Sequence, residues 1–107
     1  PEWVETALTA QPAVAQAVVL GDGQAQLDAV IWPVPGAPVP ADDAIASAVD
    51  RANATLPDYA RIGRWVLGDA ARDLADGLFT PNGRPVRERV LARHGPALAR
   101  QQAPALS

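Results

Sequence analysis

Two runs of apolar residues, several of them β-branched, constrain the fold of this chain more than any other feature. They span residues 14–20 and 25–32 and are separated by Gly21-Asp22-Gly23-Gln24. Runs of this length, joined by a short segment that contains Gly, predict a β-hairpin with its turn at those four residues. We expect this hairpin to form the centre of the core.

The alternation of side chains along a strand predicts which faces of the hairpin are buried. Three apolar residues of the first run are expected to share one face: Val14, Val18 and Leu20. Val19 falls on the opposite face, so the first strand is predicted to be central and covered on both sides. Gln26 and Asp28 predict a wetter face for the second strand.

Apolar residues at helical spacing predict three helices, over residues 1–11, 41–56 and 85–94. Gly95 and Pro96 are expected to stop the last of them. The stripes that would cover the hairpin are Ile45, Val49 and Ala52 in the second helix and Val86, Val90 and Leu91 in the last.

The remaining segments are shorter or less regular. Residues 64–67 are expected to form a third strand after a loop at 57–63, and the four prolines of segment 33–40 predict a stiff, polyproline-like connector. Residues 69–76 are ambiguous, with a helical turn as one option, and residues 97–107 are expected to be a frayed helical tail.

Composition excludes several classes of protein. The 107 residues are enough for one domain, and they contain no Cys and one His, which excludes disulfides and a structural zinc site. The net charge is −3 without a basic cluster, so nucleic acid is not an expected partner. No apolar run of about 18 residues and no signal peptide is visible, so we expect no membrane span and a cytoplasmic location. Because the sequence begins at Pro1 rather than Met, we expect it to be an excised piece of a longer protein.

Residues 76–87 carry most of the functional information. Asn82 and Gly83 predict a turn, and Pro85 is suited to the first position of a helix, so Arg84 lies where the turn meets the helix. A guanidinium on such a loop can bind a phosphate or a carboxylate held by another group. An arginine on an ordinary surface turn is the alternative, and the spacing alone favours it because a short Gly-Arg loop is a weak motif.

The single histidine and the three tryptophans are interpreted as structural. His94 is expected near a helix C-terminus, where a positive charge is favoured. Trp3, Trp32 and Trp65 are expected in the core or at an interface, with room for one of them to be exposed at a partner surface.

Several segments, taken in order, resemble one known family. They are Pro1-Glu2-Trp3-Val4-Glu5, Ala17-Val18-Val19 before Gly21, Asn53-Ala54-Thr55-Leu56-Pro57-Asp58-Tyr59-Ala60-Arg61-Ile62 and Gly77-Leu78-Phe79-Thr80-Pro81. Together they resemble the C-terminal domain of adenylate-forming (AMP-binding) enzymes, most closely that of long-chain acyl-CoA synthetase. The resemblance covers almost the whole chain.

The resemblance implies a fold and an activity. The fold would be α+β, a lid with a small, mostly antiparallel sheet made of the hairpin and a short third strand and flanked by about three helices. Residues 1–107 would be a single domain, with the large N-terminal domain and the hinge outside this chain. The full-length protein would be a ligase of fatty acid metabolism that uses ATP and Mg²⁺ to convert a small-molecule carboxylate into acyl-AMP. It would then form a thioester with CoA, although a carrier protein as acceptor stays open.

The chain departs from the family at one functional position. The late motif of the family runs Gly-Lys, two residues, then Arg, and here it reads Gly83-Arg84-Pro85-Val86-Arg87. Arg84 therefore takes the position of the lysine that bridges the substrate carboxylate and the ATP α-phosphate, and the chain has no lysine to replace it. Four further residues of this segment are implied to bind substrate: Thr80, Asn82, Gly83 and Arg87.

Two functions follow from this departure. The chain is either the lid of an acyl-CoA synthetase in which Arg84 takes over the duty of the lysine, or a catalytically degenerate lid that serves as an interaction or regulatory module. In either case the isolated domain is expected to be inactive and to bind none of these cofactors alone.

Overall fold

A computed structural model describes residues 2–21, 26–36 and 39–102, with only the backbone for 101 and 102. Three strands form one sheet in the order β1-β2-β3: β1 (Val14–Leu20), β2 (Leu27–Pro33) and β3 (Ile62–Leu67). β1 and β2 are antiparallel, as expected for the hairpin. Most of the predicted turn at residues 21–24 lies outside the described residues.

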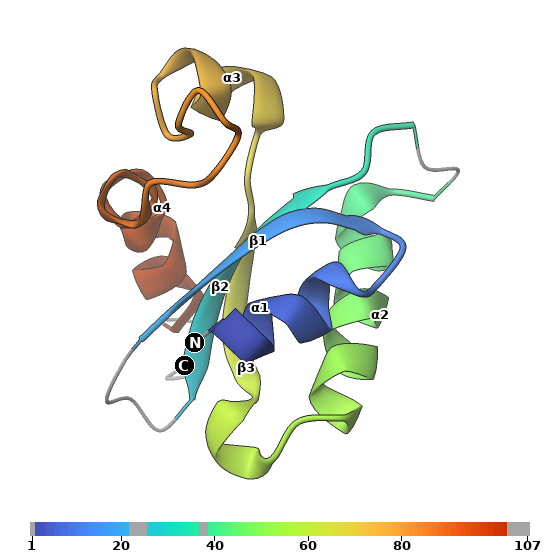
Figure 1. Cartoon of the computed structure of the whole chain (residues 1–107). Helices are drawn as coiled ribbons and strands as arrows, with labels where there is room; N and C mark the ends of the chain where they lie inside the picture. Colours follow the sequence, from blue (N-terminus) through green and yellow to red (C-terminus); the bar gives the residue numbers. More distant parts are fainter. Residues whose placement is uncertain (1, 22–25, 37–38, 103–107) are drawn as a thin grey trace.

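Four α-helices surround the sheet: α1 (Glu2–Thr9), α2 (Ala41–Ala54), α3 (Ala70–Ala75) and α4 (Arg87–Gln102). A short 3-10 helix, η1 (Asp58–Ala60), precedes β3. In Figure 1, α1 and α2 lie on one side of the sheet and α4 on the other, with α3 near one end of β3. The α+β class and the lid-like architecture are confirmed, and the helical turn over part of 69–76 is present as α3.

The third strand gives the sheet a mixed topology instead of the mostly antiparallel one expected. β3 lies parallel to β2, with Ala29 opposite Trp65, because α2 carries the chain back along the sheet before β3 begins. β2 is therefore the central strand, and the prediction that β1 is central was wrong. β3 also begins two residues earlier than expected, at Ile62. The side-chain amide of Asn53 pairs with both backbone groups of Ile62, at 2.9 and 3.1 Å, and ties the start of β3 to α2.

The predicted faces of the hairpin needed two corrections. The pairing of β1 with β2 shifts by one residue between Val14 and Gln16, so Val14 joins Val19 on the α1 and α2 side instead of joining Val18. Asp28 does not expose a face of β2 to water, because it is buried and forms an ion pair with Arg64 on the neighbouring strand. A charge inside a sheet is tolerated when it is paired and hydrogen-bonded in this way.

The sheet separates two apolar clusters, and both of its faces are covered. On the α1 and α2 side, the cluster includes the predicted stripe Ile45, Val49 and Ala52. On the α4 side, the cluster contains Val18, Leu20, Val30, Trp32, Leu78, Val90 and Leu98. Leu91 is 53% exposed and does not belong to the stripe of α4.

Helix α4 differs from its predicted form at both ends. It begins at Arg87 rather than Pro85 and continues through Gly95 and Pro96 to Gln102. Pro96 removes the donor for the carbonyl oxygen of Ala92, but both residues are exposed, so water can satisfy that oxygen. Burial of Leu98 beside Val90 keeps the helix on the sheet. Within the described residues, no helix is both long and apolar enough to cross a membrane.

Candidate functional site

The predicted site forms a closed turn before α4. Phe79 and Pro85 form an isolated antiparallel bridge that closes a loop of residues 80–84. Inside it, the backbone N–H of Thr80 donates to the carbonyl of Arg84 at 2.7 Å, and the N–H of Arg84 donates to the hydroxyl of Thr80 at 3.1 Å. Gly83 has a φ of 82°, which favours glycine, and its N–H donates to the carbonyl of Thr80 at 2.8 Å. The Arg84 turn, residues 79–85, therefore has a defined backbone.

The base of the Arg84 turn is fixed to the core. Leu78 is buried in the cluster on the α4 side, and its carbonyl accepts a hydrogen bond from the backbone N–H of Val86 at 2.7 Å. The loop on the N-terminal side is held as well, since Arg89 donates to the carbonyl of Gly77 at 2.7 Å. The turn projects from an anchored base.

The structure exposes the two side chains at the tip of the turn. Asn82 and Arg84 are exposed, and the Arg84 guanidinium has no hydrogen bond or ion pair within the described part of the chain. The planar fork of this guanidinium can bind a carboxylate or a phosphate through two parallel bonds. The exposed group can therefore bind an anion held by another domain.

Arg87 lies at the start of α4 and is used differently. Its guanidinium forms an ion pair with Glu5 of α1 at 3.0 Å and also donates to the carbonyl of Val19 on β1. The same Glu5 oxygen accepts the backbone N–H of Val19 at 2.7 Å. We call these three residues the Glu5 clamp. Thr80, Gly83 and Arg84 thus meet in one turn with Asn82 at its tip, whereas the predicted substrate contact Arg87 binds the edge of the sheet.

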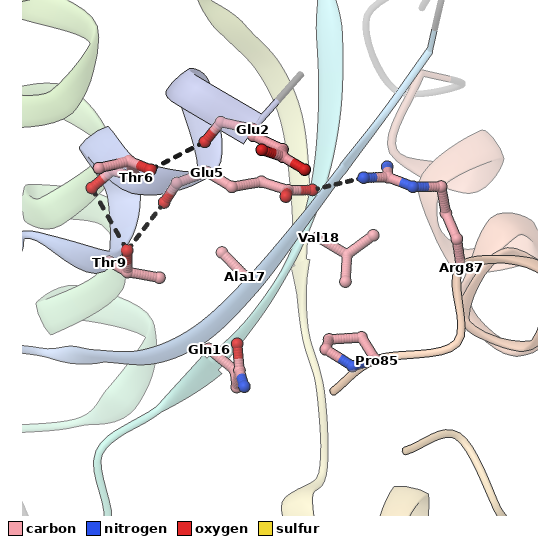
Figure 2. A pocket seen from close by; sticks show the side chains of 9 residues that line it. All are labelled: Glu2, Glu5, Thr6, Thr9, Gln16, Ala17, Val18, Pro85 and Arg87. Carbon is pink, nitrogen blue, oxygen red and sulfur yellow. Dashed lines mark hydrogen bonds and ion pairs between the residues drawn. The ribbon is translucent and has the colours of Figure 1, made fainter. Parts of the chain in front are cut away.

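A groove of about 370 Å³ lies between α1, the outer edge of β1 and the segment that enters α4. Figure 2 shows Glu5 and Arg87 reaching toward each other across β1, with Gln16 and Pro85 farther along the groove. Gln16 donates from its side-chain amide to the carbonyl of Gly83 at 3.2 Å, which joins the groove to the Arg84 turn. The hydroxyls of Thr6 and Thr9, also in this groove, donate hydrogen bonds to backbone carbonyls of α1.

A second polar cluster, not anticipated from the sequence, lies inside the α4 side of the core. One carboxylate oxygen of Asp73 in α3 accepts from the Trp32 indole N–H at 2.9 Å, and it lies 2.9 Å from Nε2 of His94. Asp73 is 1% exposed. Burial by itself would raise the pKa of Asp73, but hydrogen bonds from His94 and Trp32, the charge of His94 and the backbone N–H of Asp69 lower that pKa below its usual value.

This cluster corrects the position of His94. The residue lies in the middle of α4 rather than at its end, and its ring packs edge-on against Trp32 with centroids 6.0 Å apart. The tryptophans divide between core and surface, since Trp32 is buried whereas Trp3 is 50% exposed and packs edge-on against Tyr59. Among the described residues, no group of three His, Asp or Glu side chains is arranged to hold a metal ion.

Comparison with known proteins identifies the family and the fold of the chain. The model of a family described as "AMP-binding enzyme C-terminal domain" matches residues 1–98. No curated protein matches the chain in sequence.

Solved structures with the same fold include domains of two enzyme types. The A-PCP didomain of carboxylic acid reductase from Segniliparus rugosus in complex with AMP is 22% identical with a TM-score of 0.74, over 95% of this chain and 16% of that chain. The adenylation domain of the carboxylate reductase from Mycobacterium chelonae is 21% identical with a TM-score of 0.74, over 95% of this chain and 17% of that chain. Brucella canis acyl-CoA synthetase is 22% identical with a TM-score of 0.60, over 95% of this chain and 18% of that chain.

These likenesses concern a small part of much larger molecules, because the chain spans less than a fifth of the length of each of these solved structures. At such identities they show the fold. The family match covers nearly all of the chain and agrees with the resemblance found in the sequence. The chain belongs to the family of C-terminal domains of AMP-binding, adenylate-forming enzymes.

Proposed function

We propose that this chain is the lid of an ATP-dependent acyl-CoA synthetase and that Arg84 enters the active site of a large N-terminal domain during adenylation. The observation that carries the proposal is the Arg84 turn. Its backbone is fixed by hydrogen bonds to Thr80, while the charged side chain has no partner in the described chain. A defined loop that presents an uncommitted cation suits a group that completes a site in another domain.

In this proposal Arg84 binds the substrate carboxylate and the α-phosphate of ATP. As the carboxylate attacks the phosphorus and pyrophosphate leaves, negative charge on the phosphate oxygens is stabilised by the guanidinium. Lysine would do this as a compact point charge, whereas Arg84 offers a planar fork with two parallel donors. Mg²⁺ would be held by the ATP phosphates and the large domain, because the described residues offer no carboxylate cluster for it.

The second half-reaction uses the acyl-adenylate made in the first. We propose CoA as the acceptor, in keeping with the resemblance to acyl-CoA synthetases, and the Brucella canis enzyme supports this choice because it shares the fold. The carboxylic acid reductase structures share it as well, and one of them is described as an A-PCP didomain. A carrier protein is therefore the alternative acceptor. A thioester assay that offers both CoA and a carrier protein would decide between them.

The competing function is a degenerate lid that serves only as an interaction module. ATP–pyrophosphate exchange separates the two. The chain alone should show no exchange, because the ATP and acyl sites lie in the large domain, and the chain joined to its large domain should show it with a fatty acid. Exchange by the isolated chain, or none by the joined protein, would contradict the proposal.

A further inference from the structure

Two side chains that the sequence analysis did not assign to the site, Gln16 and Glu5, hold the Arg84 turn and the start of α4. Gln16 on β1 binds the carbonyl of Gly83, the residue directly before Arg84. Glu5 on α1 binds Arg87, three residues after Arg84. We propose that Glu5 and Gln16 are positioning residues that set the direction of the Arg84 side chain for adenylation. This inference rests on the proposed function of Arg84.

The Glu5 clamp is built more firmly than an ordinary surface ion pair. The Glu5 side chain is only 20% exposed, and one of its oxygens receives both the Val19 N–H at 2.7 Å and the Arg87 guanidinium at 3.0 Å. Val19 lies on the edge strand, so its N–H and its carbonyl, which accepts from Arg87, point away from β2. The clamp therefore fixes the start of α4 to the backbone of β1 through three bonds instead of one.

The Gln16 contact acts at the other side of Arg84. It joins residues that are 67 positions apart in the sequence, at 3.2 Å from the amide nitrogen to the Gly83 carbonyl. Gly83 has a positive φ, and a Cβ on it would meet nothing within 4 Å, so no side chain packs against that side of the residue. Without Gln16, the tip of the turn would lose its bond to β1, and its internal hydrogen bonds would open more often although its base stays anchored.

The bonds from Gln16 to Gly83 and from Glu5 to Arg87 explain how the position of an exposed arginine can be controlled. Arg84 carries a long side chain with many rotamers, and the protein can limit only the position of its backbone before the large domain closes over it. A misplacement of about 1 Å in a catalytic group can cost about 10²-fold in rate. Fixing Gly83 and Arg87 to the same edge strand removes motion of the turn relative to the sheet.

A purely structural role would look different in a kinetic test. If Glu5 and Gln16 only stabilised the fold, their loss would slow every reaction of the enzyme and would do so whether or not Arg84 were present. If they position Arg84, their loss should slow adenylation alone, and only while the guanidinium is there. A double-mutant cycle with Arg84→Ala measures this difference.

The experiment uses the joined enzyme, this chain with its large domain, and the variants Glu5→Ala and Gln16→Ala in the Arg84 and the Arg84→Ala backgrounds. Glu2→Ala is the matched control, since Glu2 lies in the same first turn of α1 and lines the same groove without contacting Arg87. We expect each test variant to slow ATP–pyrophosphate exchange about tenfold with Arg84 present and less than twofold without it. Glu2→Ala should change neither rate.

Thioester formation from preformed acyl-adenylate reports on folding in the same samples, and it should stay within twofold of the parent. Amide hydrogen exchange of the chain gives a second readout, because the Arg84 N–H should exchange severalfold faster in Gln16→Ala and unchanged in Glu2→Ala. Equal slowing in both backgrounds, or no slowing with Arg84 present, would overturn the positioning role and leave the function of Arg84 intact. If Arg84→Ala itself were as fast as the parent, the proposed function and the positioning role would both fall.

Discussion

Arg84 and Arg87 are separated by two residues, but the structure uses their guanidinium groups in opposite ways. Arg87 is bound to Glu5 of α1 at 3.0 Å and to the edge strand, whereas Arg84 is exposed and has no bond within the described chain. The family motif contains both positions as cations. Arg87 therefore forms the Glu5 clamp, whereas the Arg84 side chain is available to contact a group outside this domain.

The burial of Val18 gives a direct test of the core. Val18 is 3% exposed and belongs to the cluster that α4 covers. Val18→Ala should lower the free energy of unfolding by about 1 to 3 kcal/mol, because it removes buried methyl groups and leaves a cavity. Urea denaturation measures the loss. Val39→Ala is the control, since Val39 is 50% exposed and its truncation should cost no more than about 0.5 kcal/mol.

Gly68 is predicted to tolerate no side chain. A Cβ at this position would lie 2.1 Å from the indole nitrogen of Trp32, which is buried and bound to Asp73. Gly68→Ala should therefore destabilise the fold by about 1 to 3 kcal/mol, as expected for overpacking. Gly95→Ala should cost less, because Gly95 lies inside α4 and a Cβ there would meet the exposed Leu91 at 3.4 Å. The gain in helix propensity is offset by the clash of the new Cβ with the ring of Pro96, so the free energy of unfolding should change by less than about 1 kcal/mol. Equal effects of both changes on the melting temperature would contradict this packing.

Asp73 predicts a pH dependence of stability. Its pKa is lowered in the folded protein, where the charged form accepts bonds from His94 and Trp32. A lowered pKa contributes stability above the unfolded value of about 3.9, and that stability is lost as the pH falls through the folded pKa. The free energy of unfolding should therefore fall more steeply below about pH 4 in the parent than in Asp73→Asn. Parallel curves for the two proteins would show that Asp73 gains nothing from its partners.

Much of the scaffold could be predicted from local pattern. The apolar runs, the stripe of α2 and the prolines after α1 and α2 identified the hairpin and two helices within a few residues. The parallel pairing of β3 could not be read from its own residues, because strand direction depends on how α2 crosses the sheet. The bulge near Val14 shifted the faces of β1, and a single inserted residue leaves no signature in an apolar run.

The failures near the site have a common physical cause. Gly95-Pro96 is a local stop signal, and burial of Leu98 overrides it once α4 lies on the sheet. Asp73 and His94 are 21 positions apart, and Glu5 and Arg87 are 82 apart, so neither pair has a local signal. Only the fold brings these charges together. The Arg84 turn could be predicted because Asn-Gly and the following Pro act through the local backbone.

The central claim is that Arg84 acts in adenylation, and the most direct test compares both half-reactions in the joined enzyme. Arg84→Ala should slow acyl-adenylate formation by a factor on the order of 10² or more, because the guanidinium stabilises charge that develops in the transition state. Thioester formation from preformed acyl-adenylate should be nearly unchanged, since the resemblance to adenylate-forming enzymes implies that the lid rotates and uses another face for that step. If Arg84→Ala and Arg84→Lys both leave adenylation at the parent rate, Arg84 has no catalytic role, and the interaction-module function is the one that stands.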